Sequence, residues 1–181
     1  MEKKLIIFTD IGDTVIDEST EVRKVPFGVV LEAQCIPGAR ETLLKLHAQG
    51  YTIALVADGL EQSFRNTMQE HGLSHVFAAW VVSEPLGVEK PDQRMFETAM
   101  QRLGLTEADK QRVIMVGNNL ARDMVGANRF GIRSVHMDWS PRYPDTARVP
   151  EETPTYTVHS PDELLPLVEC LERQLEEKQD A

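Results

Sequence analysis

The amino-acid sequence predicts an α/β protein in which a mostly parallel sheet lies between two layers of helices, a three-layer α/β/α sandwich. Strand-like apolar runs alternate with helical patterns along the chain, and this order implies right-handed crossovers between parallel strands. The first run, "LIIF", is apolar without alternation, which is typical of a strand buried on both faces. The strand-like runs are residues 5–8, 52–56, 78–82, 112–116 and 133–137.

Helical patterns fill most of the intervals between these runs. The segment 37–50 begins at a proline, ends at a glycine and carries an apolar stripe. Three further segments, 60–72, 91–104 and 121–131, also end in a glycine suited to a helix C-terminus. The C-terminal segment opens with a Ser or Asp cap and an acidic first turn, and it stays amphipathic to about Leu175.

Length, charge and cysteine content limit the classes of function. We expect one domain over residues 1–181, because this length suffices for a single sizeable core. A net charge of -10 repels nucleic acid and anionic membranes, so we expect neither as a partner. Cys35 and Cys170 lie far apart without metal-type spacing, which favours reduced thiols in a cytoplasmic protein. We expect no signal peptide and no transmembrane segment, since the apolar runs are short.

Polar residues follow four of the predicted strands. The carboxyl ends of parallel strands meet at one edge of a sheet, where α/β proteins bind their ligands. We therefore expect these four groups of residues to converge. They are Asp10, Gly12, Asp13 and Thr14 after the first strand, Ala57, Asp58 and Gly59 after the second, Lys90, Pro91 and Asp92 after the third, and Gly117, Asn118, Asn119 and Asp123 after the fourth.

The segments that carry these residues resemble the motifs of the haloacid dehalogenase (HAD) superfamily in order and spacing. They read "IIFTDIGDTV", "IALVADG", "GVEKPDQRMFETAMQRLGL" and "VIMVGNNLARDMVGANRFGI". The last two are similar to the subfamily of phosphoglycolate-phosphatase-like enzymes, and the resemblance covers about residues 4 to 170. It implies a Rossmann-like, HAD-like sheet and a Mg²⁺-dependent phosphohydrolase.

The resemblance also implies a role for individual residues. Asp10 would be the nucleophile that forms an aspartyl-phosphate, which splits one difficult displacement into two easier steps. Lys90 would hold Asp10 and the phosphoryl oxygens, and Thr14 would orient the loop. Mg²⁺ would be held by Asp10, the Gly12 carbonyl and Asp123. Taken alone, each charged residue has an ordinary structural interpretation. Asp10 would be a turn or cap residue, Lys90 a solvated surface lysine, and Asp123 an acid at the start of a helix.

One departure from the family pattern concerns acid catalysis. Relatives have a second aspartate two residues after the nucleophile, followed by glycine, and that aspartate protonates the leaving oxygen. Here the order is reversed, giving Gly12 and then Asp13. Neighbouring side chains of an extended segment point to opposite faces, so we expect Asp13 to point away from Asp10. General acid catalysis contributes roughly 10²–10⁴ in rate, so this loss would slow the enzyme.

Two further departures concern phosphate and metal binding. The second motif, Ala57, Asp58 and Gly59, stands where the family binds the phosphoryl group, yet Ala57 lacks the usual hydroxyl donor and Asp58 replaces the usual Asn. Asn118 replaces the usual metal-binding Asp. Its amide oxygen is still a Mg²⁺ ligand, but the lost charge predicts weaker metal binding.

A short insert, residues 15–37, stands where relatives carry a helical cap domain, and it has room only for a hairpin or a short helix. We expect an open site, which excludes water poorly. A neighbouring subunit in a homo-oligomer would cover the site. Alternatively, the substrate would be a phosphorylated macromolecule that covers the site itself, instead of a small phosphorylated molecule. The run 25–33, "VPFGVVLEA", is either a contact surface or packs on the chain's own core.

The segment 139–154 contains four prolines, so we expect a loop rather than a helix or strand. It follows the fifth strand, and Arg142 in it is suited to bind a substrate phosphate or carboxylate. The alternative is a proline-rich loop pinned to the surface by Trp139.

The sequence leaves three alternative functions open. The first is Mg²⁺-dependent phosphomonoester hydrolysis through Asp10, with slow turnover. The second is a binding or regulatory protein that has kept the site but lost turnover. The third is a metal-free dehalogenase, which Gly12 disfavours because that group carries an aromatic residue there.

Overall fold

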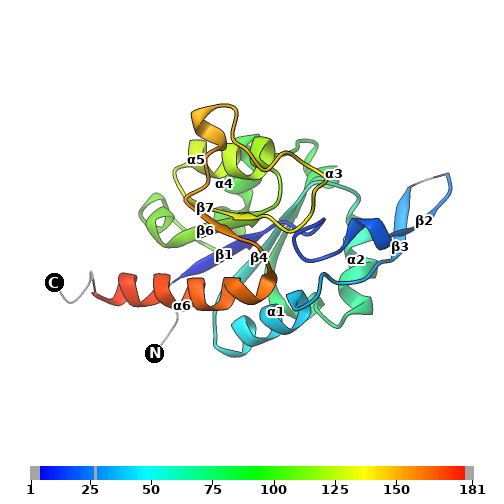
Figure 1. The fold of residues 1–181 in the computed structure, drawn as a ribbon, viewed down its shortest axis with the longest axis horizontal. Helices are drawn as coiled ribbons and strands as arrows, with labels where there is room; N and C mark the ends of the chain where they lie inside the picture. Colours follow the sequence, from blue (N-terminus) through cyan, green and yellow to red (C-terminus); the bar gives the residue numbers. More distant parts are fainter. Residues whose placement is uncertain (1–4, 27, 178–181) are drawn as a thin grey trace.

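A six-stranded parallel sheet forms the centre of the protein. The computed structural model describes residues 5–26 and 28–177. The strands lie in the order β5-β4-β1-β6-β7-β8, so β1 is central (Figure 1). Their bounds are β1 Ile6–Thr9, β4 Thr52–Ala57, β5 Phe77–Val82, β6 Val113–Gly117, β7 Arg133–Met137 and β8 Tyr156–Val158.

Helices cover both faces of this sheet, which confirms the predicted three-layer architecture (Figure 1). α1, α2 and α6 contribute to one apolar core, and α4 and α5 contribute to the other. The helices are α1 Ala39–Ala48, α2 Glu61–Glu70, α3 Ser83–Leu86, α4 Gln93–Arg102, α5 Val125–Phe130 and α6 Pro161–Glu177. Shorter turns of 3-10 helix are Glu18–Thr20, Ser74–Val76, Glu107–Arg112 and Pro150–Glu152, and Leu120–Met124 is a π-helical turn.

The central strand shows why an unbroken apolar run is needed here. Leu5 and Ile7 face the core formed with α1, α2 and α6, whereas Ile6 and Phe8 face the core formed with α4 and α5. Each is at most 3% exposed, because both faces of the strand are covered. The buried N–H of Leu5 donates to Oε2 of Glu172 on α6, 2.9 Å away. This helix therefore supplies the hydrogen-bond acceptor that the buried backbone before β1 needs.

The insert forms a hairpin, which is one of the two forms predicted for it. β2 Val22–Lys24 and β3 Val29–Glu32 pair antiparallel and project beside α2 (Figure 1). β3 is tied to α2 because the N–H of Val30 donates to Oγ of Ser63, 2.9 Å away. Within the run 25–33, Val30 packs on the core while Val25 is exposed, and Phe27 lies outside the described residues.

Two details differ from the sequence prediction. The sheet has a sixth strand, β8, which pairs with β7 at the edge. The segment 139–154 is largely irregular, but Pro150–Glu152 forms a turn of 3-10 helix. No helix within the described ranges is long and apolar enough to cross a membrane.

Candidate active site

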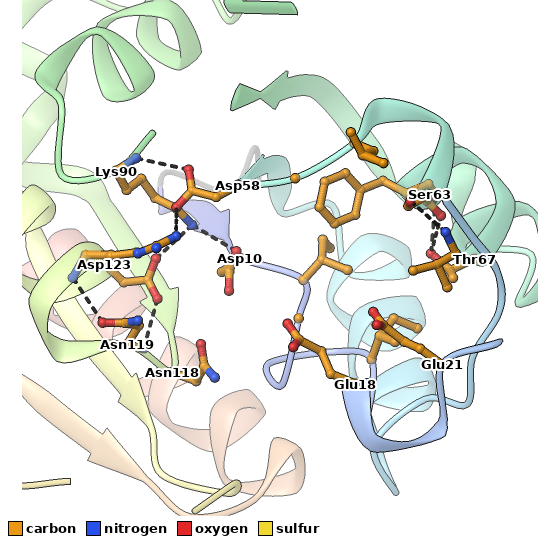
Figure 2. Close-up of a pocket in the computed structure, with 18 of the residues that line it drawn as sticks. Asp10, Glu18, Glu21, Asp58, Ser63, Thr67, Lys90, Asn118, Asn119 and Asp123 are labelled. Atoms are coloured by element: carbon orange, nitrogen blue, oxygen red, sulfur yellow. Dashed lines mark hydrogen bonds and ion pairs between the residues drawn. The ribbon is translucent and has the colours of Figure 1, made fainter. Parts of the chain in front are cut away.

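The strand-end residues converge as predicted at the carboxyl edge of the sheet (Figure 2). Asp10 follows β1, Asp58 follows β4, and Asp123 lies on the π-helical turn after β6. Nζ of Lys90 lies 2.8 Å from Oδ1 of Asp10 and 2.8 Å from Oδ1 of Asp123. One ammonium group therefore joins the two carboxylates that the sequence analysis placed around it.

Lys90 is held in one position by contacts at both ends of the residue. Its side chain is 1% exposed, and Nζ also donates to the carbonyl oxygen of Val56, 2.8 Å away. Its backbone N–H donates to Oδ1 of Asp58 at 3.0 Å. The charge is fixed before any ligand arrives, so little reorganisation is needed when negative charge develops nearby.

Local geometry explains how Asp123 reaches Lys90. Asn119 caps the π-helical turn by accepting hydrogen bonds from the N–H groups of Ala121 and Arg122. Oδ2 of Asp123 accepts a hydrogen bond from the N–H of Asn119 at 3.0 Å, which folds the side chain back towards the end of β6. A Cβ on Gly117 would lie 2.3 Å from Cγ of Asp123, so only glycine leaves room for the carboxylate.

The charges shift one another's proton affinities. Burial raises the pKa of Asp10 to about 7; Lys90 opposes this shift, and Asp123 adds to it. Burial alone would lower the pKa of Lys90, but the carboxylates of Asp10, Asp123 and Asp58 outweigh it and raise that pKa above its ordinary value. Burial likewise raises the pKa of Asp58. Two carboxylates thus contact one buried ammonium group and a third, that of Asp58, lies near it, so negative charge exceeds positive charge around Lys90.

This donor set fits a hard divalent cation. Asp10 and Asn118 line the same cavity and offer carboxylate and amide oxygens, and the backbone of Gly12 lies beside them. Oxygen ligands of this kind suit Mg²⁺, and its charge would offset the excess negative charge. Among the described residues, no three acidic, histidine or cysteine side chains are grouped to hold a metal by themselves, so a metal here requires the amide and carbonyl oxygens.

The cavity continues from Asp10 towards the hairpin and α2, a wall that the sequence analysis did not predict (Figure 2). Glu18 and Glu21 lie on this side, and Glu21 pairs with Arg23. Apolar and hydroxyl side chains complete the wall: Ile11, Ile16, Val30, Leu60, Phe64, Ser63 and Thr67. Ser63 and Thr67 are four residues apart on a helix, and this spacing of polar residues could have indicated the wall.

Some predicted site residues line this cavity and others do not. Asp58, Gly59 and Asn118 line it, together with the three charged residues Asp10, Lys90 and Asp123. Thr14 does not: it is buried on another side of the loop, and its hydroxyl has no hydrogen-bond partner in the described part of the chain. Ala57 is fully buried within β4 and presents no side chain to the cavity.

Arg142 is also placed differently from the prediction. Nε of Arg142 forms an ion pair with the carboxylate of Asp13 and lies 3.3 Å from Oε2 of Glu18. It is therefore held by the chain's own acids, outside the cavity that Asp10 lines. Ser140 and Arg142 of the loop after β7 both contact Asp13, whereas Tyr143 of the same loop lines the cavity.

Asp13 points away from Asp10, as predicted. It adopts a left-handed backbone conformation with φ 46°, an uncommon one for a residue other than glycine. Its carboxylate accepts hydrogen bonds from the N–H of Glu18 at 3.0 Å and from the hydroxyl of Ser140 at 3.0 Å. Asp13 thus ties the first motif to two other segments and is not placed to act on a ligand beside Asp10.

Two further residues lie at the rim of the cavity: Arg122, which the sequence analysis missed, and Tyr143, which we expected to reach this edge because it follows the fifth predicted strand. NH1 of Arg122 lies 3.6 Å from Oδ2 of Asp58, and the side chain remains 44% exposed. Tyr143 lines the same cavity from the loop after β7. The helical position of Arg122, one residue before Asp123, gave no sign of this proximity, because it depends on the π-helical turn.

Comparison with known proteins agrees with this geometry. A model of the family described as haloacid dehalogenase-like hydrolase matches residues 11–137. The chain belongs to this family. The match begins one residue after Asp10 and includes the hairpin, Lys90 and Asp123.

Two relatives of this HAD-like hydrolase are named for different activities. A glyceraldehyde 3-phosphate phosphatase from Methanopyrus kandleri is 32% identical over 138 residues, which are 73% of this chain and 55% of that protein. The (S)-2-haloacid dehalogenase 4A from Burkholderia cepacia is 30% identical over 137 residues, 76% of this chain and 56% of that protein. The chain spans about half the length of the curated relatives it matches.

Solved structures share the fold of this HAD-like hydrolase. An uncharacterized protein from Listeria monocytogenes serotype 4b matches with a TM-score of 0.76 at 23% identity, over 93% of this chain and 99% of that one. The putative HAD-hydrolase YfnB from Bacillus subtilis, bound to magnesium, matches with a TM-score of 0.65 at 25% identity, over 75% of this chain and 56% of that one.

Proposed function

We propose that this protein hydrolyses phosphomonoesters, with Asp10 as the nucleophile and Mg²⁺ as the cofactor. The observation that carries the proposal is the convergence of Asp10, Lys90 and Asp123 within 2.8 Å contacts at the edge of the sheet. A carboxylate beside a fixed ammonium group is suited to attack phosphorus, because the ammonium offsets the charge of the incoming anion.

The reaction proceeds in two displacements. Lys90 holds Oδ1 of Asp10, which leaves Oδ2 as the attacking atom. An Asp10 oxygen–phosphorus bond forms while the bond from phosphorus to the ester oxygen breaks, and the alcohol leaves. Water then attacks the aspartyl-phosphate, releasing inorganic phosphate and restoring Asp10.

The cation would be held by Asp10, the carbonyl of Gly12 and Asn118, with Asp123 nearby. When bound, Mg²⁺ neutralises charge on the transferring phosphoryl group. The excess negative charge around Lys90 supports a cation at this place. The magnesium in the YfnB structure supports the same proposal by analogy, as do the relatives named phosphatases.

The substrate is proposed to be a small phosphorylated molecule or a phosphorylated macromolecule. The hairpin forms one wall of the cavity but leaves a rim that includes the exposed Arg122. A second copy of the chain that covers this rim stays a prediction, as does a cytoplasmic location.

The test is phosphate release from p-nitrophenyl phosphate with Mg²⁺, with a chelator, and with Asp10→Asn. We expect turnover that requires Mg²⁺ and falls by roughly 10³-fold or more in Asp10→Asn, because the nucleophile is lost. Asp145→Asn, an exposed acid in the loop after β7, is the matched control and should retain the wild-type rate. Equal rates in all conditions would remove the proposal.

The structure also favours a second candidate, a binding protein without turnover. Ala57 presents no phosphoryl donor and Asn118 carries no charge, so both phosphate and metal are held by fewer interactions than in relatives. Binding of inorganic phosphate with no hydrolysis across a broad phosphate panel would support this candidate. Halide release from 2-haloacids would instead support a dehalogenase activity, as in the name of the Burkholderia cepacia relative.

A further inference from the structure

Glu18 occupies the space that a side chain at position 12 would enter. A Cβ built on Gly12 would lie 1.9 Å from Oε1 of Glu18 and 2.9 Å from its Cδ. These distances are well below van der Waals contact, so the carboxylate of Glu18 sits against the backbone two residues after Asp10. Figure 2 shows Glu18 on the opposite side of Asp10 from Lys90, in the same cavity.

The local fold holds Glu18 in this place. Asp17 caps the 3-10 turn Glu18–Thr20, and the N–H of Glu18 donates to Oδ1 of Asp13 at 3.0 Å. Oε2 lies 3.3 Å from Nε of Arg142, so Oε1 is the oxygen that faces Gly12. The side chain is 27% exposed, which leaves it accessible from the cavity.

The pair with Arg142 does not by itself account for Glu18. Nε of Arg142 already forms a closer ion pair with Asp13, which is 1% exposed and fixed by Ser140. An acid needed only to neutralise Arg142 would have no reason to face Gly12. The approach of Oε1 to Gly12 points to a role towards the ligand.

We propose that Glu18 is the group that gives a proton to the leaving oxygen of the phosphomonoester, in the place where relatives use a side chain at position 12. This proposal rests on the proposed function of Asp10. As the ester P–O bond breaks, the carboxyl proton of Glu18 moves to the leaving oxygen and gives a neutral alcohol. In the second displacement, the attacking water returns a proton to the Glu18 carboxylate, so the cycle closes without another reagent.

The first experiment compares leaving groups in Glu18→Gln. We expect kcat for an alkyl phosphate such as glycerol phosphate to fall by roughly 10²–10³-fold, because a poor leaving group needs the proton. For p-nitrophenyl phosphate we expect a fall of less than about tenfold, because nitrophenolate leaves without one. KM should change little. Glu32→Gln, an exposed acid on the same hairpin, is the matched control.

The second experiment exchanges the two positions. Gly12→Asp alone should lower activity towards alkyl phosphates, because its Cβ collides with Oε1 of Glu18. Gly12→Asp combined with Glu18→Ala should restore a large part of the activity that Glu18→Ala alone loses, since the space is then vacant and an acid returns to it. A residue that only pairs with Arg142 predicts no such rescue.

The outcomes separate this inference from the proposed function. Wild-type protein that releases no phosphate from any ester would end the proposed function. Active wild-type protein with an equal loss for alkyl and aryl esters in Glu18→Gln, and no rescue in the double variant, would overturn the role of Glu18 while leaving Asp10 intact. Urea midpoints of all variants identify a loss that is due to unfolding and not to the missing acid.

Discussion

The two sides of the Asp10 cavity are built differently. On the Lys90 side, the charges sit at the ends of buried strands, and Lys90 and Asp123 are each 1% exposed. On the hairpin side, Glu18 and Arg23 are 27% and 53% exposed and belong to the short insert. In the proposed reaction, the sheet edge would fix the groups that act on phosphorus, whereas the insert would supply those nearest the rest of the substrate. Charge at the sheet edge should be costly to change, and the insert should tolerate variation.

Lys90→Met tests the first half of this comparison and should have the largest effect. Removing the ammonium leaves the carboxylates of Asp10 and Asp123 unpaired and buried, so the free energy of unfolding should fall by about 3–5 kcal/mol. Phosphatase activity should fall by roughly 10³-fold. Urea denaturation with a chelator measures the stability, and Lys24→Met on the exposed β2 is the control. An unchanged urea midpoint would contradict the structural role of Lys90.

Gly117→Ala should have the next largest effect, because it displaces one acid without removing a charge. The new Cβ would lie 2.3 Å from Cγ of Asp123, and we expect kcat/KM to fall by roughly 10²-fold. Gly126→Ala is the matched control: its Cβ would lie 2.5 Å from the Phe96 ring in the core. That variant should lose stability but keep its rate per folded molecule. Equal rates in both variants would show that Asp123 need not be held closely.

The pH dependence of the rate sharpens the comparison further. Burial raises the pKa of Asp10 to about 7, and the proposed attack on phosphorus requires the carboxylate form. At low Mg²⁺, kcat/KM for p-nitrophenyl phosphate, whose leaving group needs no proton from Glu18, should therefore rise about tenfold per pH unit below pH 7 and level off above it. A bound cation favours the charged form, so saturating Mg²⁺ should move this limb to lower pH. A limb that does not move would place the cation away from Asp10.

Phe64→Ala tests the hairpin side and should have the smallest effect. Phe64 lines the cavity from α2 and packs near Gly59. Its loss should raise KM for an aryl phosphate by roughly three- to tenfold, with kcat nearly unchanged. Apolar contact with the leaving group stabilises the bound substrate and the transition state equally. Inhibition by inorganic phosphate, which has no leaving group, should not change. A loss confined to kcat would mean that this wall positions Asp10 instead.

The sequence predicted the sheet edge well because topology alone determines it. Once strands are parallel and buried, the residues after them must meet, so Asp10, Lys90 and Asp123 could be brought together without any side-chain detail. β8 was not predicted because three residues at an edge carry too little periodicity. Thr14 and Arg142 were misplaced for a different reason: their positions depend on how loops fold.

The hairpin side could not be predicted for the same reason. The contact between Glu18 and Gly12 follows from the left-handed turn at Asp13, and no local pattern specifies that turn. The distance along the chain from β3 to Ser63 also concealed that the insert and α2 form one wall. Sequence spacing thus located the groups at strand ends but not those that a turn brings back.

The hydrogen bond from Leu5 to Glu172 joins residues 167 positions apart and links the strand that precedes Asp10 to α6. Glu172 is added by the ribosome 167 residues after Leu5, so the centre of the sheet lacks this partner until α6 has been made. Removal of the C-terminal helix would leave a buried amide without its acceptor beside the strand that carries Asp10. The N–H at the start of the central strand therefore gains its acceptor only when α6 docks on the sheet.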